Sequence, residues 1–116
     1  MVNIIEEKSF NFAVRVVNLY KHLTAEKKEF VLSKQLLRSG TSIGANIAEA
    51  EHPQSNADYL SKMNIALKEA NETCYWLKLL VTTDYINNTQ YNSINTDAKE
   101  LICILTSILK TSNSSN

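Results

Sequence analysis

The chain has 116 residues, a length that fits one domain able to bury about two thirds of its unfolded surface. Two glycines and one proline provide little material for the tight turns of a β-sheet, so the composition excludes an all-β fold and predicts an all-α one. Twelve Lys and Arg residues balance twelve Asp and Glu residues, which excludes the strong overall positive charge that is typical of a nucleic-acid-binding protein.

We predict a single helical domain over residues 1–110 and a disordered tail over residues 111–116. No window approaches about 18 uninterrupted apolar residues, and the N-terminal residues lack a basic start followed by an apolar run. We therefore expect a cytoplasmic protein without a membrane contact. Cys74 and Cys103 each lie in an apolar helical pattern without CxxC spacing, which predicts reduced thiols in the core.

A first helix is predicted over residues 4–22, where apolar residues recur three or four positions apart. Its inner face consists of Phe12, Val16, Leu19 and Leu23. Thr24 is predicted to cap a second helix. That helix should end near Glu51, because His52-Pro53 disfavours helical backbone.

The second half of the chain predicts two further helices with the same apolar rhythm. Ser55-Asn-Ala-Asp58 has the form of a capping box, and apolar residues then recur from Leu60 to Val81. Polar residues at 84, 87 and 88 predict a turn, and the apolar rhythm resumes from Ile94 to Ile108. Long helices joined by short connections favour an antiparallel, up-and-down four-helix bundle.

The segment from Ser33 to Ala50 keeps a helical rhythm through two glycines. Each glycine costs a helix about 1 kcal/mol relative to alanine, so packing must offset this cost. Gly40, Gly44 and Ala48 form a stripe of small residues. We expect another backbone to approach closely along this stripe.

Two adjoining stretches carry a family resemblance. They read Gln35-Leu-Leu-Arg38-Ser-Gly-Thr-Ser42-Ile-Gly-Ala-Asn46-Ile-Ala-Glu49-Ala and Asp58-Tyr-Leu-Ser-Lys62-Met-Asn-Ile-Ala-Leu-Lys68-Glu-Ala-Asn-Glu72-Thr-Cys-Tyr-Trp76-Leu. The chain resembles the bacterial "four helix bundle protein" family, which includes proteins encoded in intervening sequences of 23S ribosomal RNA genes. The chain departs from many members, which have proline at the position of Gly44 and arginine at the position of Ala48.

The resemblance implies a four-helix protomer that assembles into a ring of five with a central channel. It also implies kinship with the accessory variability protein of diversity-generating retroelements, which works with a reverse transcriptase and nucleic acid. Members carried by ribosomal RNA insertions have no agreed biochemical activity. The resemblance therefore implies a homopentamer with RNA, DNA or a protein as its partner.

Polar residues line one face of the second predicted helix. They are Gln35, Arg38, Ser42, Asn46 and Glu49. One interpretation is a recognition strip, with Arg38 on a phosphate and the amides offering hydrogen bonds. The alternative is a network within the core or across a subunit interface, because buried polar groups need partners.

The first two predicted helices also contain most of the basic residues. The candidate nucleic-acid contacts are Arg15, Lys21, Lys27, Lys28, Lys34 and Arg38. A ring would repeat such a patch in every protomer, and contacts with phosphates would make binding depend on salt. The alternative is an ordinary solvated surface, since glutamates are interspersed.

Apolar residues outside the seam of the third predicted helix suggest a second buried face. The candidate interface residues are Tyr75, Trp76 and Leu80. A homo-oligomer would bury them, because soluble monomers rarely expose large apolar patches. The alternative for Trp76 is that it closes the core of the monomer.

Motifs for catalysis are weak. Glu49-x-x-His52 has the spacing of a di-metal site in a helical bundle, but the other histidine, His22, has no glutamate three residues before it. Neither cysteine has a histidine nearby in sequence, and Ser-Gly-Thr-Ser-Ile-Gly lacks the lysine of a phosphate-binding loop. We predict a non-catalytic protein without a metal or cofactor. We expect an accessory role with nucleic acid or, alternatively, that of a structural adaptor for protein partners; a di-metal carboxylate enzyme that uses Glu49 and His52 is a remote alternative.

Overall fold

The computed structural model describes residues 4–114 and forms four α-helices. They are α1 (Ile4–Ala25), α2 (Leu32–Ala50), α3 (Asn56–Thr82) and α4 (Asn88–Ser114). Residues 4–114 contain no β-strand, and the predicted all-α class is confirmed.

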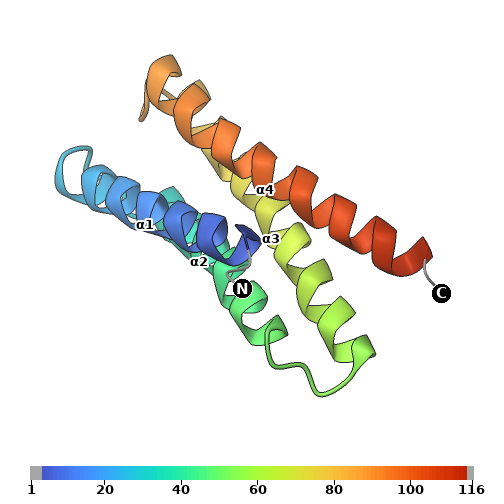
Figure 1. Cartoon of the computed structure of the whole chain (residues 1–116). Coiled ribbons are helices and arrows are strands. Elements are labelled where there is room, and N and C mark those ends of the chain that lie inside the picture. The colour runs from blue at the N-terminus through green and yellow to red at the C-terminus, as the bar shows by residue number, and fades with distance from the viewer. Residues whose placement is uncertain (1–3, 115–116) are drawn as a thin grey trace.

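Each helix packs against the next one in the chain, and α4 also contacts α1. Among the described residues, α1 does not pack on α3, nor α2 on α4, so the helices follow one another around the bundle. The bundle measures 47 × 24 × 21 Å along its principal axes. Figure 1 shows the α1–α2 pair beside the α3–α4 pair, with the two chain ends well apart.

The connection between α1 and α2 differs from the sequence prediction. Thr24 does not cap α2, because its hydroxyl donates to the carbonyl of Tyr20 at 3.0 Å and α1 continues to Ala25. The carboxylate of Glu29 caps α2 instead and accepts hydrogen bonds from three backbone N–H groups. The donors are Val31 at 3.1 Å, Leu32 at 2.8 Å and Ser33 at 2.7 Å.

Two opposing effects act on the pKa of Glu29. Burial favours the neutral carboxyl and would raise the pKa. The hydrogen bonds from Leu32, Ser33 and Val31 favour the carboxylate and outweigh burial, so the pKa lies below its ordinary value. The start of α2 is therefore stabilised by a negative charge.

The caps of α3 and α4 are local. The predicted cap of α3 is confirmed, since the hydroxyl of Ser55 accepts from the backbone N–H of Asp58 at 3.0 Å. At α4, the side chains of Asn87 and Gln90 each accept a hydrogen bond from the other's backbone N–H at 2.8 Å. The helix then extends to Ser114, so residues 111–114 are helical where a disordered tail was predicted. Residues 115–116 lie outside the described residues.

The expected close approach along α2 is confirmed and involves α1. A Cβ atom placed on Gly40 would lie 2.7 Å from a methyl carbon of Val16, and one on Gly44 would lie 3.3 Å from the carbonyl oxygen of Ser9. On the side of α2 that meets α3, the buried hydroxyl of Thr73 donates to that of Ser39 at 3.0 Å. Glycine thus lets α1 and α2 pack with their backbones close together.

Candidate functional site

Arg15 joins α1 to α4 and is not a free cation. Its guanidinium forms an ion pair with Asp97, with a distance of 2.7 Å between Nη1 and Oδ2. The same group donates to the hydroxyl of Ser93 at 2.9 Å and to its carbonyl at 3.2 Å. Arg15 was predicted to contact nucleic acid, and in this fold its guanidinium is paired with a carboxylate of the same chain.

Arg38 is likewise engaged within the chain. Its guanidinium pairs with Glu69 at 3.0 Å and also with Glu72, both on α3. Glu69 is buried, so the arginine supplies the opposite charge that its carboxylate needs. The two carboxylates offset the positive charge of this guanidinium, whose side chain is 49% exposed.

The remaining polar residues of the strip make contacts within α2 or with α3. Asn46 donates to the carbonyl of Ser42 at 2.8 Å, and Ser42 donates to the carbonyl of Arg38 at 2.6 Å. Gln35 accepts from Arg38 at 3.5 Å, and Glu49 lies 3.7 Å from the ammonium of Lys62 on α3. Arg38 and Glu49 thus pair with α3 of the same chain, whereas Ser42 and Asn46 donate to carbonyls of α2 itself.

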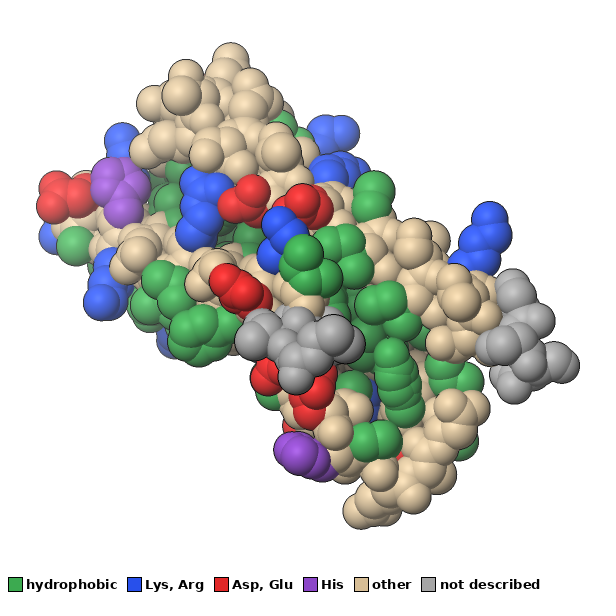
Figure 2. Space-filling view, in the orientation of Figure 1, with side chains coloured by type: hydrophobic (Ala, Val, Ile, Leu, Met, Phe, Trp, Pro, Cys, Tyr) green, Lys and Arg blue, Asp and Glu red, His purple; other side chains and the backbone are tan. Residues whose placement is uncertain are grey.

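The other basic residues of the first half form a separate group. Lys21 lies near the end of α1, Lys27 and Lys28 lie in the connection, and Lys34 lies in the first turn of α2. All four side chains are exposed, and none forms an ion pair within residues 4–114. We call this group the lysine end. Figure 2 shows Lys and Arg side chains around the end of the bundle that contains the α1–α2 connection.

The neutral chain therefore has two ends of opposite charge. Towards the α1–α2 and α3–α4 connections the basic residues outnumber the acidic ones, namely Lys21, Lys27, Lys28, Lys34 and Lys78 against Glu26, Glu29 and Asp84. Towards the α2–α3 connection the acidic residues outnumber the basic ones, namely Glu6, Glu7, Glu49, Glu51 and Asp58 against Lys8, Lys62 and Lys110. The sequence indicated a basic first half, and folding concentrates its free cations at one end.

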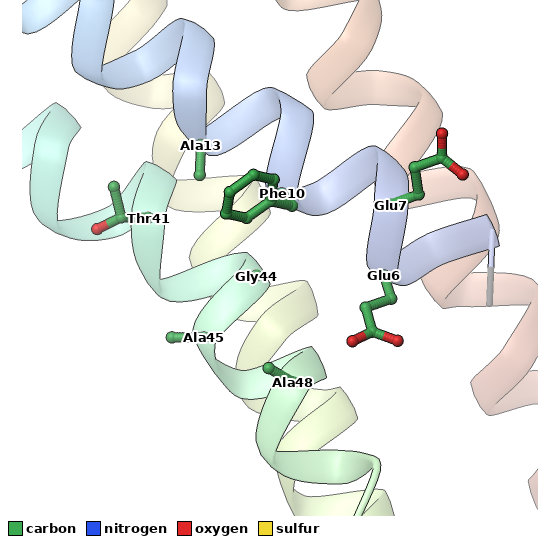
Figure 3. A pocket seen from close by; sticks show the side chains of 8 residues that line it. All are labelled: Glu6, Glu7, Phe10, Ala13, Thr41, Gly44, Ala45 and Ala48. Atoms are coloured by element: carbon green, nitrogen blue, oxygen red, sulfur yellow. The ribbon is translucent and has the colours of Figure 1, made fainter. Parts of the chain in front are cut away.

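An apolar groove runs along the outer side of α1 and α2, and the sequence analysis missed it. Its volume is 790 Å³, and Phe10, 67% exposed, lies across a floor of Gly44, Ala45 and Ala48. Figure 3 shows the ring of Phe10 directed toward α2, with Glu6 at one end of the groove. Figure 2 shows further hydrophobic side chains along the edge of α1 away from α4. One feature of the sequence could have indicated this groove: Phe10 is a large apolar residue that lies outside the predicted inner face of its helix.

The predicted interface residues of α3 separate into three environments. Leu80 is fully buried in the core of the single chain, so its assignment to a subunit interface is corrected. Trp76 is half-buried and donates to Glu72 at 3.3 Å. Tyr75 is 59% exposed and meets Trp76 edge to face, with ring centroids 5.2 Å apart. Tyr75 is thus the member of the set that a neighbour could reach most easily.

The cysteines and histidines provide little chemistry. Cys74 is half-buried, and burial raises the pKa of its thiol. Cys103 is exposed on α4, so its predicted place in the core was wrong. Within residues 4–114, no three His, Cys, Asp or Glu side chains gather as metal ligands would. Over the same residues, every helix is too short or too polar to cross a lipid bilayer.

The four packed helices define the chain as an all-α four-helix bundle protein. Its distinctive features, the lysine end and the apolar groove, lie on its surface. A family model described as "23S rRNA-intervening sequence protein" matches residues 2–107, and the chain belongs to this family.

A solved structure from Bacteroides thetaiotaomicron VPI-5482 is 64% identical to the chain. The match covers 92% of this chain and 99% of that one, with a TM-score of 0.91. That structure is described as a protein with unknown function from the S23 ribosomal protein family. Among curated proteins, none matches the chain.

Proposed function

We propose that this protein is a non-catalytic, homo-oligomeric accessory factor that binds RNA or DNA through its lysine end. The observation that carries the proposal is the difference between the two groups of cations. The arginines are paired with carboxylates inside the chain, whereas Lys21, Lys27, Lys28 and Lys34 are exposed and unpaired. Free lysines can exchange their counterions for phosphates, which drives association with nucleic acid at low salt.

Four lysines are a small patch for a nucleic-acid-binding protein. Assembly would compensate, because each additional copy in a symmetric oligomer repeats the patch. The family includes products of 23S rRNA intervening sequences, which makes a structured RNA a natural first ligand to test. A ring of five protomers, as the resemblance implies, would present twenty such lysines if all lysine ends faced one side.

The exposed apolar side chains support a homo-oligomer. Seven large hydrophobic residues of the described chain are at least 40% exposed. Five of these lie on α1 or in the α1–α2 connection: Ile4, Phe10, Val14, Phe30 and Val31. Exposed large apolar side chains on a protein of this size favour a role in contacts between subunits.

Fluorescence anisotropy tests the nucleic-acid part of the proposal. Wild-type protein would be titrated into a labelled structured RNA and a labelled DNA duplex from about 50 to 200 mM salt, over which phosphate-driven affinity falls steeply. A Lys27→Ala/Lys34→Ala variant should bind more weakly and with a smaller salt slope. The matched control is Lys99→Ala/Lys110→Ala, which removes two charges from α4 and should bind like wild type.

Absence of binding at the lowest salt would overturn the proposal. The same result would favour the alternative of a structural adaptor for protein partners, which the apolar groove also suits. Equal loss of affinity in both variants would show that net charge matters and the lysine end does not.

A further inference from the structure

We infer that a cleft between α1 and α4, beside the lysine end, takes an unpaired adenine base. The cleft has a volume of 480 Å³, within the range of about 300 to 1,000 Å³ that is usual for small-molecule sites. Figure 1 shows that α1 ends and α4 begins at this end of the bundle. The inference rests on the proposed binding of nucleic acid and specifies which nucleotide the protein selects.

The cleft has an apolar floor and polar walls. Its floor consists of Ile94, which is 4% exposed, and the half-buried Leu19. The walls carry the short, exposed side chains of Asn18 on α1 and of Thr89 and Ser93 on α4, which leave space between the two helices. An apolar floor with a few polar groups around it suits a ring that has apolar faces and hydrogen-bonding edges, as a nucleobase has.

Several polar groups of the cleft have no partner within residues 4–114. The amide of Asn18, the imidazole of His22 and the hydroxyl of Thr89 form no hydrogen bond or ion pair there. The amide oxygen of Gln90 accepts from the backbone N–H of Asn87 at 2.8 Å, so only its nitrogen remains available. Asn18 is therefore the amide that offers a ligand both a donor and an acceptor.

This donor and acceptor favour adenine among the four bases. The amide of an asparagine can pair with adenine through two hydrogen bonds, donating to N7 and accepting from N6–H. Guanine is instead read most often by the two donors of an arginine. Arg15 at the side of the cleft is engaged, because it pairs with Asp97 at 2.7 Å and donates to the hydroxyl of Ser93 at 2.9 Å.

The base must be unpaired to enter the cleft. Side chains cannot read the deep, narrow major groove of an RNA duplex, whereas the bases of bulges and single strands are free to pack on aromatic rings such as that of His22. Lys21 is exposed and lies three residues from Asn18 on the same helix, so it is placed to contact a phosphate that flanks the base. The cleft would thus add base selectivity to the charge of the lysine end.

Three labelled RNA hairpins test this inference. Their sequences are identical except for a single bulged adenine, a single bulged uracil or no bulge. In fluorescence anisotropy at about 50 mM salt, wild type should bind the adenine bulge about five to ten times more tightly than the other two hairpins. Asn18→Ala should bind all three equally. The matched control Asn11→Ala makes the same change at an exposed position of α1 outside the cleft and should keep the preference.

A second variant tests the lysine end independently of the cleft. Lys27→Ala/Lys34→Ala should weaken the binding of all three hairpins and leave the ratio between the adenine and uracil bulges unchanged. A ratio that falls to one in this variant would overturn the assignment of base selectivity to the cleft.

The remaining outcomes separate this inference from the proposed function. Absence of binding to every hairpin would overturn the proposed function and this inference with it. Equal binding of wild type to all three would overturn the adenine cleft and leave the lysine end in place. An adenine preference that Asn18→Ala retains would show that the base binds elsewhere.

Free AMP distinguishes a mononucleotide from a base within a strand. In calorimetry, AMP should bind at least about tenfold more weakly than the adenine bulge, because a mononucleotide has only one phosphate to offer the lysines. AMP binding as tight as that of the bulge would make the free nucleotide the ligand and overturn recognition within RNA.

Discussion

Gly40 on α2 faces Val16 on α1 so closely that a Cβ atom on the glycine would lie 2.7 Å from a methyl carbon of the valine. Both residues are buried, and Val16 is a β-branched side chain with no exposed surface. The close packing of α1 on α2 therefore requires that residue 40 has no Cβ atom.

We expect Gly40→Ala to destabilise the bundle. Overpacking costs about 1 to 3 kcal/mol, which exceeds the gain of about 1 kcal/mol in helix propensity. Urea unfolding should show a net loss of about 1 kcal/mol. Adding Val16→Ala should relieve the clash, so the double variant should be more stable than the sum of the single effects predicts. Strictly additive effects would contradict this account.

Glu29→Gln should destabilise the start of α2. The amide retains one acceptor oxygen and loses the charge, and the loss of a helix cap costs about 0.5 to 2 kcal/mol at neutral pH. The pKa of Glu29 is lower in the folded chain than its ordinary value of 4.5. Its contribution to the free energy of unfolding is therefore complete above pH 4.5 and is lost as the pH falls through the folded pKa.

The check is urea unfolding of wild type and Glu29→Gln at several pH values from 7 to 3. The difference in stability between the two proteins should be constant above the unfolded pKa and shrink below it. A difference that does not change with pH would show that the carboxylate charge contributes nothing.

The variant Arg38→Ala distinguishes a structural role of this arginine from a role in nucleic-acid binding. Removing the guanidinium leaves the buried carboxylate of Glu69 without its partner, so stability should fall by about 1 kcal/mol. Affinity for nucleic acid and its salt slope should equal those of wild type, because Arg38 is already neutralised. Chemical denaturation and anisotropy on the same sample would measure both quantities. A salt slope reduced by about one would instead place Arg38 on a phosphate.

The two cysteines should differ in reactivity toward iodoacetamide. Cys103 is exposed, whereas Cys74 is half-buried with a thiol pKa raised by burial, which lowers its thiolate fraction. Mass spectrometry of the native protein should find Cys103 alkylated first, and urea should make the two rates similar. Faster labelling of Cys74 in the native protein would contradict its position in the bundle.

Local patterns in the sequence predicted the helices well, because their signals lie within a few residues of one another. Ser55 and Asp58 are three positions apart and cap α3 as expected. Thr24 was assigned to the wrong helix because its hydroxyl bonds back into α1, and the carboxylate that caps α2 comes from Glu29 in the connection. In the sequence, a threonine followed by charged residues looks the same whether its hydroxyl caps the next helix or bonds back into the preceding one.

The candidate site was less predictable, because its charges are set by contacts between distant segments. Arg15 and Asp97 are 82 residues apart, and Arg38 and Glu69 are 31 residues apart. Neither pair leaves a signal in a local window, so the arginines could not be distinguished from the free lysines. Leu80 was misplaced for a related reason. A helix that packs on two neighbours buries a wider stripe than a single heptad seam indicates.

The separation of charge between the two ends of the bundle has a consequence for diffusional encounter. A neutral molecule gains no net attraction toward a polyanion, but unequal charge at its two ends creates a torque in the polyanion's field. This torque would turn the protein so that Lys27 and Lys34 arrive first and the end with Glu49 and Asp58 trails. The charge separation would then set the orientation of the approach, while the zero net charge would leave its rate close to that of an uncharged body.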